Sequence, residues 1–224
     1  MELIPNLTQA FMQHPLGLCS RHDPAGTVMG VDDIENRLGI VALGSIIDIN
    51  PLSHERWSLL VAIADHWLLE PGKVAYQSSQ QVRTGMDEVS LLGQRHITRV
   101  WWQISRGVQG RFKGSWRELI SANNDNAQEL DNYLRENRAT FPVLAGPVVA
   151  VRWLDLIHRV GGVNLKGWED LRLPLTGNQK KTALLLGNDD RQVHPMMFQA
   201  LSLWITACKK LPDTLCGFDK CPRK

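Results

Sequence analysis

The sequence predicts an all-α protein, and two observations carry this prediction. Apolar residues recur every three or four positions through most of the chain, the spacing that places them on one face of a helix. No run of alternating apolar and polar residues indicates a strand, and no internal repeat is visible. We expect an irregular arm over residues 1–30, N-terminal helices over 31–95, a helical lobe over 96–163 and a C-terminal helical lobe over 164–224.

Composition and hydropathy favour an ordinary globular protein. The 224 residues are 43% apolar and 21% charged, and a net charge of +2 says little about partners. No apolar run approaches the roughly 20 residues of a membrane helix. The N-terminal stretch lacks the basic start and long apolar centre of a signal peptide. We therefore expect a cytoplasmic monomer with no membrane partner.

The N-terminal helices are expected on either side of Pro51. Acidic residues suit a helix N-terminus, so the first helix should run over 32–48. The second should start at Ser53 and end at the pair Pro71-Gly72. A polar loop rich in Gln and Ser is expected over 73–85.

The next apolar pattern, which starts at about Asp87, predicts one long helix whose polar side carries Arg95, His96, Arg99 and Arg106. Ser115 and Glu118 then have the spacing of a capping box, in which the hydroxyl accepts a backbone N–H and the carboxylate reaches back. A short helix should follow them. Another helix should be capped by Asn124 or Asp125.

The stretch from Thr140 to Gly187 carries most of the functional information. Gly146 is expected to take the left-handed conformation that turns the chain. Pro147 suits the first turn of the next helix, which should run to Val160, because its missing N–H would have no partner there. Free N–H groups at this helix start form a potential anion site, although such a turn is more often only structural.

Two further features follow in the chain. Leu173-Pro-Leu-Thr176 precedes an amphipathic helix that contains Lys180. A last helix is expected from Pro195 to Cys208, where a cluster of three cysteines begins.

Positive charge is concentrated between Arg95 and Arg117, a segment without any acidic residue. Its basic residues are Arg95, His96, Arg99, Arg106, Arg111, Lys113 and Arg117. Interleaved glycines would let a phosphate approach the backbone closely. The alternative is a solvated helix face followed by a loop, and the charges alone do not decide between the two.

The order of these motifs resembles the helix-hairpin-helix DNA glycosylases, the superfamily of endonuclease III and 8-oxoguanine glycosylase, over about residues 97–222. The hairpin is similar to the family's Leu-Pro-Gly-Val-Gly-x-Lys-x-Ala, and Leu173-Pro-Leu-Thr176 is similar to its Val-Pro-Val-Asp turn. The segment 106–111 is similar to one in which a helix ends in a Gly- and Gln-rich loop that wedges into the duplex. The resemblance implies a two-lobed all-α fold and DNA as the partner.

The resemblance also implies which residues meet DNA. The implied DNA-binding positions are Arg106, Gln109, Arg111, Lys113, Leu144, Gly146, Val148 and Lys180. Trp102 and Trp153 are the implied walls of a base pocket, since flipped bases are commonly read by stacking. Tryptophans at helical spacing are more often core residues, and that is the alternative for both.

The catalytic positions depart from the family pattern. Val148 falls where bifunctional members keep a Schiff-base lysine, so lyase chemistry is not expected. Thr176 falls where the essential aspartate sits, and a hydroxyl cannot stabilise an oxocarbenium-like sugar as a carboxylate does. Asp155 is then the first candidate acid, with Thr176 positioning water or the sugar. The alternative for Asp155 is an ion pair with Arg152 or Arg159 on its own helix.

Cys208, Cys216 and Cys221 are similar in place to the family's iron–sulfur loop. Such a cluster normally takes four thiolates, and the spacings here do not match. A fourth ligand would have to come from Cys19, His22 or His194. An iron–sulfur cluster or zinc, reduced thiols without a cofactor, and a single disulfide are the alternatives.

Three functions follow from the resemblance. The first is monofunctional hydrolysis of the N-glycosidic bond of an unusual or modified base in DNA, as in repair or defence against modified DNA. The second is a non-catalytic DNA-binding member of the fold. The third is a nucleoside hydrolase or salvage enzyme, which would not need the basic segment.

Overall fold

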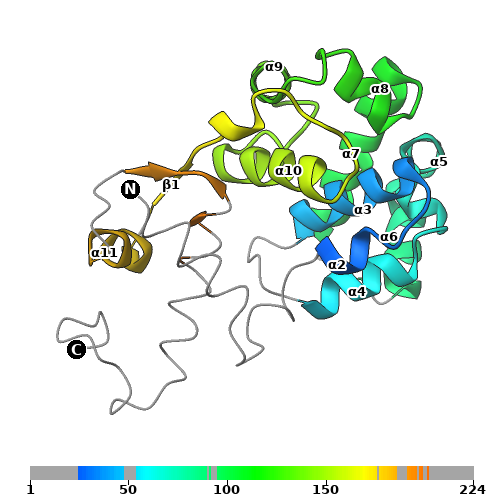
Figure 1. Ribbon diagram of the computed structural model, residues 1–224. Helices are drawn as coiled ribbons and strands as arrows, with labels where there is room; N and C mark the ends of the chain where they lie inside the picture. The colour runs from blue at the N-terminus through cyan, green and yellow to red at the C-terminus, as the bar shows by residue number, and fades with distance from the viewer. Residues whose placement is uncertain are drawn as a thin grey trace, which may run out of the picture. The chain divides into compact units, whose positions relative to one another are not determined.

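The computed structural model describes residues 25–47, 54–89, 91, 95–175, 177–185, 191–195, 197–198 and 201. The chain divides into two compact units, one of Pro24–Trp168 and the other of Met1–Asp23 with Glu169–Lys224. The described residues are mainly helical and contain one two-stranded sheet (Figure 1). The predicted all-α class is therefore confirmed.

The described part of the Pro24–Trp168 unit is built from helices. They are α2 (Ala25–Val28), α3 (Ile34–Ile47), α4 (His54–Ala62), the 3-10 helix η1 (Trp67–Leu69), α5 (Pro71–Ala75), α6 (Ser79–Glu88), α7 (Arg95–Phe112), α8 (Trp116–Ser121), α9 (Ala127–Glu136) and α10 (Pro147–Arg159). The predicted helices over 32–48 and 148–160 are confirmed as α3 and α10.

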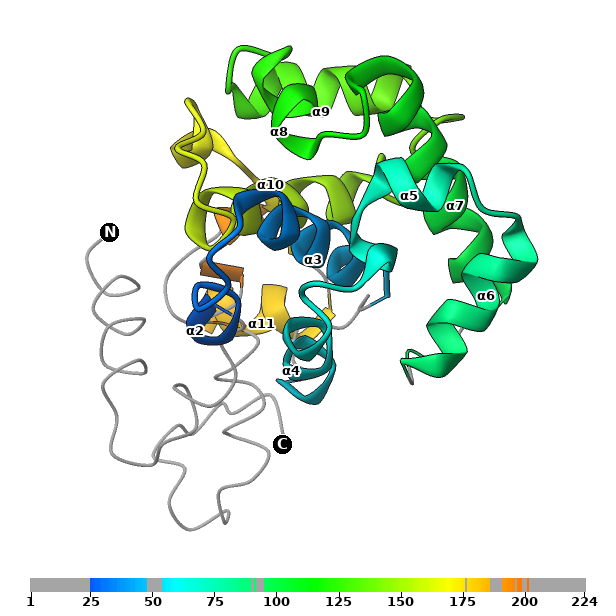
Figure 2. The ribbon, with the colours of Figure 1, turned by 90° about the vertical axis from the view of Figure 1, so that its right-hand side faces the viewer.

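The helix α3 is central to this unit. Its residues from Leu38 to Ile46 are all buried, and it contacts α4, α7, α8, α10 and η1. Figure 2 shows it between α10 and α4. A Cβ at Gly39 would lie 2.5 Å from the Leu69 carbonyl oxygen, and one at Gly44 would lie 2.5 Å from the Trp57 ring. Both glycines are therefore required by close packing.

Three buried tryptophans form the aromatic part of the core. The rings of Trp101 on α7 and Trp116 on α8 stack with centroids 5.8 Å apart. Trp153 on α10 meets Trp116 edge-on at 6.0 Å. Trp101 also donates its Nε1–H to the Leu68 carbonyl at 2.8 Å. This cluster joins α7, α8, α10 and η1.

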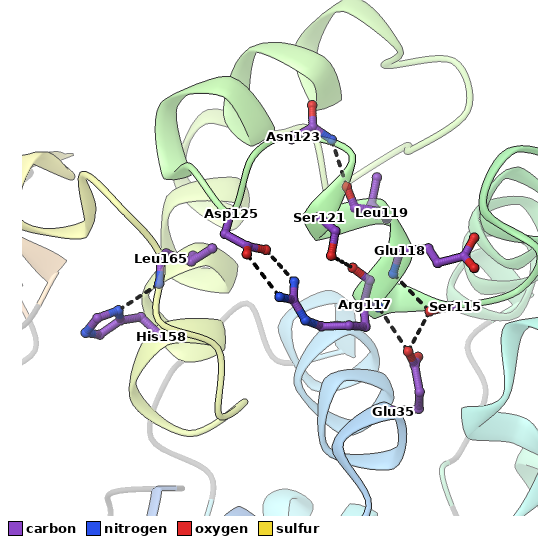
Figure 3. Close-up of polar contacts among 10 residues, drawn as sticks. All are labelled: Glu35, Ser115, Arg117, Glu118, Leu119, Ser121, Asn123, Asp125, His158 and Leu165. Carbon is purple, nitrogen blue, oxygen red and sulfur yellow. Dashed lines mark hydrogen bonds and ion pairs between the residues drawn. The ribbon is translucent and has the colours of Figure 1, made fainter.

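The N-terminus of α8 is capped from a distant part of the chain. Ser115 accepts the N–H of Glu118 at 2.9 Å, as its spacing predicts. The acid at the site, however, is Glu35 of α3. Its carboxylate accepts from the Ser115 hydroxyl at 2.6 Å and from the N–H groups of Trp116 and Arg117 at 2.8 and 3.1 Å (Figure 3). A negative charge at this end also complements the helix dipole.

The second predicted helix is too long, and the predicted polar loop is helical. The helix α4 ends at Ala62, and Pro71 begins α5, because its fixed φ and missing N–H suit a first helical turn. Ser78 and Gln81 then form a complete capping box at the start of α6. The prediction of a loop over 73–85 is wrong, since the Ser-x-x-Gln spacing and the apolar residues behind it define a helix.

The helix α7 lies later in the chain than expected. The sequence predicts one helix from about Asp87 to at least Arg106, but α6 already ends at Glu88 and α7 spans Arg95–Phe112. The segment 106–111 is therefore helical, and the prediction of a wedging loop there is wrong. Gly107 within it is required by packing, because a Cβ would lie 2.2 Å from Cγ2 of Thr140.

The hairpin between α9 and α10 is turned by Val143 and not by Gly146. Val143 has a φ of 66°, in a region that is costly for a β-branched residue. Gly146 has a φ of −71° and is the N-cap of α10, so its predicted left-handed conformation is wrong. It is needed instead for close approach, because a Cβ there would lie 2.9 Å from the Val143 carbonyl oxygen.

The turn between α8 and α9 carries an ion pair. Asn124 and Asp125 both have left-handed φ angles, of 59° and 52°, so the N-cap of α9 is Asn126 and not either of the predicted residues. Arg117 donates to both carboxylate oxygens of Asp125 (Figure 3). This hydrogen bonding, more than the accompanying charge attraction, holds the pKa of Asp125 below its usual value.

The described part of the other unit contains β1 (Leu173–Pro174), α11 (Gly177–Leu185) and β2 (Gln192–Val193). The two strands pair antiparallel, with Leu173 opposite Val193. The predicted helix is confirmed as α11. The strands were not predicted, because two residues are too few to show alternation. A small apolar core is formed by Leu175, Ala183, Val193 and Leu201.

Replacing Glu35 by glutamine is expected to lower the free energy of unfolding by about 1–2 kcal/mol, because three bonds at the start of α8 lose a charged acceptor. Urea denaturation measures this change. The matched control is Glu136→Gln, at an exposed site that forms no hydrogen bond or ion pair with the described residues. Equal effects of the two substitutions would show that Glu35 has no special role.

Asp125→Asn is expected to destabilise the protein by about 1 kcal/mol or less at pH 7, because the lost pair is partly exposed. The pKa of Asp125 is lower in the folded protein than in the unfolded chain, so its ionised carboxylate stabilises the fold at pH values above the unfolded pKa of about 4. This contribution is lost as the pH falls through the folded-state pKa. Thermal denaturation of both proteins should therefore converge toward about pH 2. A difference that stays constant over that range would contradict this assignment.

Candidate nucleic-acid interface

The exposed face of α7 carries arginines that have no acidic partner. Arg99 and Arg106 lie two helical turns apart and are both exposed. Neither forms a hydrogen bond or ion pair with a described residue. The opposite face of α7 buries Trp101 and Ile104 in the core. The side of the helix that meets solvent is therefore fixed by packing.

These arginines line a pocket between α7 and the turn that follows α9, here called the α7 pocket. Its volume is about 520 Å³. Its walls include Arg99, Trp102, Gln103, Arg106, Arg111 and Thr140. No acidic residue and no lysine lines it. A concave surface with several cations and no anion attracts a negatively charged ligand.

Two of the arginines are held by uncharged groups. The guanidinium carbon of Arg106 lies 4.9 Å from the centre of the Trp102 ring, a cation–π contact. Arg111 donates from Nη1 to the Tyr133 hydroxyl at 3.0 Å and to Oδ1 of Asn137. Because none of these partners is negative, the positive charges stay uncompensated while their positions are restricted.

Two glycines of α7, Gly107 and Gly110, also line the pocket, and they differ in the space around them. Gly107 is required by its contact with Thr140. No atom lies within 4 Å of the position that a Cβ at Gly110 would take. Glycine inside a helix costs about 0.5–1 kcal/mol relative to alanine. Neither packing nor backbone conformation therefore accounts for Gly110.

The predicted contacts Gln109 and Lys113 do not line this pocket. Gln109 lies toward α5, where its amide is 3.3 Å from the Tyr76 hydroxyl. Lys113 follows α7 with a φ of 52°, and its ammonium is 3.9 Å from Glu118. Lys180 is exposed on α11 of the other unit. Of the predicted basic contacts, the pocket brings together only Arg106 and Arg111.

The pocket includes residues that were not predicted as contacts. Arg99 and Gln103 share one helix face with the predicted Arg106, at the spacing i, i+4, i+7, and this spacing could have identified them. Thr140 comes from a separate turn, and nothing in its sequence context indicates that it lies here. Gln103 donates to the carbonyl of Ala139, which ties this turn to α7.

The hairpin before α10 offers fewer free N–H groups than predicted. Those of Leu144, Ala145 and Gly146 donate to carbonyls within the turn at 2.8–2.9 Å. The Leu144 side chain is also buried. The N–H groups of Val148 and Val149 in the first turn of α10 have no acceptor among the described residues. Of the predicted hairpin contacts, only the N–H groups in the first turn of α10 are available to an anion.

Asp155 is buried and paired. Its Oδ2 accepts Nε and Nη2 of Arg159 at 3.0 and 2.8 Å, and its Oδ1 accepts the Trp168 Nε1–H at 3.0 Å. The side chain is 6% exposed. The structural alternative, an ion pair with Arg159, is confirmed. The catalytic role of Asp155 stays a prediction, and the carboxylate does not line the α7 pocket.

Trp102 and Trp153 do not form one base pocket. Trp102 lines the α7 pocket and donates its Nε1–H to the Gln77 carbonyl at 2.9 Å. Trp153 is fully buried in the aromatic core. The expectation that both would hold a base is wrong for Trp153, because its ring fills the space between α8 and α10.

The remaining predicted sites lie outside the described residues. They are Thr176, Cys208, Cys216 and Cys221, together with most of the predicted last helix. Within the described ranges, no group of three or more His, Cys, Asp or Glu residues is placed to hold a metal ion. Helices in those ranges are also too short or too polar to cross a membrane. The iron–sulfur or zinc site stays a prediction.

Fold and site together define a helical protein with an arginine-lined pocket on one exposed helix face. No protein-family model, curated protein or solved structure matches the chain. The functional interpretation therefore depends on the geometry described above.

Asp155→Asn is expected to reduce the free energy of unfolding by about 3 kcal/mol, because it removes the negative charge that pairs with the largely buried Arg159 guanidinium. Chemical denaturation measures the loss. The matched control is Asp87→Asn, which removes the carboxylate of an exposed pair with Arg83 and should cost about 0.5 kcal/mol or less. A small effect at both positions would contradict the anchoring role of Asp155.

Proposed function

We propose that the protein binds DNA through the arginine face of α7 and the first turn of α10. The observation that carries this proposal is the α7 pocket, where three arginines converge without an acidic neighbour. Arginine suits phosphate because its planar guanidinium can donate two parallel hydrogen bonds. Arg99 and Arg106 are exposed on one side of a rigid helix, so they could contact neighbouring phosphates of one strand.

We propose further that the fold is of the two-lobed helix-hairpin-helix glycosylase type. In support, α9 and α10 pack together and are joined by the segment 137–146, which ends at Gly146, the N-cap of α10. The free N–H groups of Val148 and Val149 at the start of α10 are suited to a phosphate. This would be a second backbone contact besides the arginine face.

Binding without base excision is the form of the proposal that the geometry supports best. Excision requires a carboxylate or an activated nucleophile near the sugar. The α7 pocket contains no acid or lysine, and Asp155 is engaged by Arg159 and Trp168. A nucleoside hydrolase would need an acid as well, and it would have no use for an extended basic face.

The double substitution Arg99→Gln with Arg106→Gln is expected to weaken DNA binding by about tenfold or more at moderate salt, because two phosphate contacts are lost. The slope of log affinity against log salt concentration should become shallower by about 1–2. Fluorescence anisotropy with a short duplex at several salt concentrations measures both quantities.

The control for this experiment is Arg83→Gln, which removes an arginine of α6 that already pairs with Asp87. It should leave affinity and slope nearly unchanged. An unchanged slope in the double variant would sink the proposal. Incubation of the natural protein with duplexes carrying modified bases separates binding from excision, since abasic sites would establish the glycosylase alternative.

A further inference from the structure

We propose that the α7 pocket holds a phosphate monoester, carried either by the 5′-phosphorylated end of a DNA strand or by a free mononucleotide. This goes beyond attachment to the phosphodiester backbone. If the phosphate belongs to a DNA strand end, this proposal rests on the proposed function. The free mononucleotide tests the pocket by itself.

The charge of the pocket favours a monoester over a diester. Arg99, Arg106 and Arg111 contribute three cations, and no acidic side chain lines the pocket to offset them. A monoester carries about −1.5 to −2 charges near neutral pH and offers three acceptor oxygens. A backbone diester carries one charge. Because Coulomb attraction scales with the product of the charges, the monoester gains more from each arginine.

The arginines are also arranged before a ligand binds. Arg106 is fixed on the Trp102 ring, and Arg111 is fixed by Tyr133 and Asn137. Arg99 is exposed and has no partner among the described residues. Groups that are already in place lose little conformational entropy on binding. Two held arginines can therefore define the phosphate position, and Arg99 can close on it.

The size of the pocket indicates more than a bare phosphate. Its volume of about 520 Å³ lies within the range of small-molecule sites. The Arg106 guanidinium lies over Trp102 and presents a flat surface, and nucleic-acid bases stack on guanidinium planes. A nucleotide can thus place its phosphate among the arginines and its base against Arg106.

Gly110 identifies the point at which the ligand approaches α7. It lines the pocket, and the space beyond its absent Cβ is empty. A Cβ at this position would meet no neighbouring atom, and glycine weakens the helix. A ligand that occupies this space explains why the helix has a glycine here. Gly107 cannot serve the same test, since a Cβ there would meet Thr140.

The test uses Gly110→Leu, which fills the pocket and leaves every arginine in place. Isothermal titration with 5′-AMP is expected to show binding to the natural protein and a loss of about tenfold or more in the variant. The melting temperature should be unchanged or higher. The matched control is Gln80→Leu, which adds a leucine at an exposed position of α6 outside the pocket and should bind 5′-AMP normally.

A second measurement distinguishes the two sources of the phosphate. Anisotropy compares a duplex with 5′-phosphate ends and the same duplex with 5′-hydroxyl ends. The pocket is assigned to strand ends by two results together. The natural protein prefers the phosphorylated duplex, and Gly110→Leu loses this preference but still binds the hydroxyl duplex. Binding of 5′-AMP without an end preference assigns it to a free nucleotide.

The proposal is overturned if neither 5′-AMP nor a 5′-phosphate end is preferred, or if Gly110→Leu binds both like the natural protein. Should Gly110→Leu lower the melting temperature, Gly110→Ala and Arg99→Gln decide by the same measurements. Failure to bind any duplex while 5′-AMP still binds would overturn the proposed function and leave the pocket assignment intact. Salt-dependent binding of both duplexes, with no preference for 5′-phosphate ends and no binding of 5′-AMP, would overturn the pocket assignment and leave the proposed function intact.

Discussion

The packing of Trp101, Trp116 and Trp153 is the contact on which the rest of the Pro24–Trp168 unit depends. Each ring comes from a different helix, so their packing sets how α7, α8 and α10 meet. Glu35 adds a polar tie by capping α8 from α3. With Trp101 turned inward, Arg99, Arg106 and Arg111 of α7 face solvent. The relative positions of these arginines are therefore set by the core, since a well-packed helix keeps the spacing of the residues it carries.

Helices with strong apolar patterns were predictable from the sequence, and turns with unusual backbone conformations were not. The helices α3 and α10 were predicted because their apolar residues recur at helical spacing. The position of α7 was missed because the apolar pattern continues through the break that follows α6. The hairpin was misassigned because glycine is the usual left-handed residue, whereas here Val143 adopts that conformation and Gly146 lies beside its carbonyl.

The charge of the candidate site could be predicted from the sequence, but the directions of its side chains could not. Charge segregation between Arg95 and Arg117 is visible in the sequence, but the direction of each side chain depends on whether the segment is a loop or a helix. As a continuous helix, α7 presents Arg99 and Arg106 on one side and sends Gln109 toward α5. Thr140 lies more than 25 residues further along the chain, so only the tertiary structure places it in the pocket. The partners of Asp155 were predictable in part, because Arg159 lies one turn away on the same helix, whereas Trp168 does not.

The exposed face of α7 that lines the pocket lacks features that usually stabilise a helix surface. Three arginines without acidic neighbours repel one another and forgo ion pairs, and Gly110 weakens the helix by about 0.5–1 kcal/mol relative to alanine. Elsewhere in the same unit, Arg83, Arg117, Arg135 and Arg159 all pair with acids. Three arginines without an acidic partner among the described residues, Arg99, Arg106 and Arg111, line the α7 pocket. A bound anion would remove the repulsion and occupy the space beside Gly110. The repulsion among these arginines and the proposed binding of an anion thus have the same physical origin.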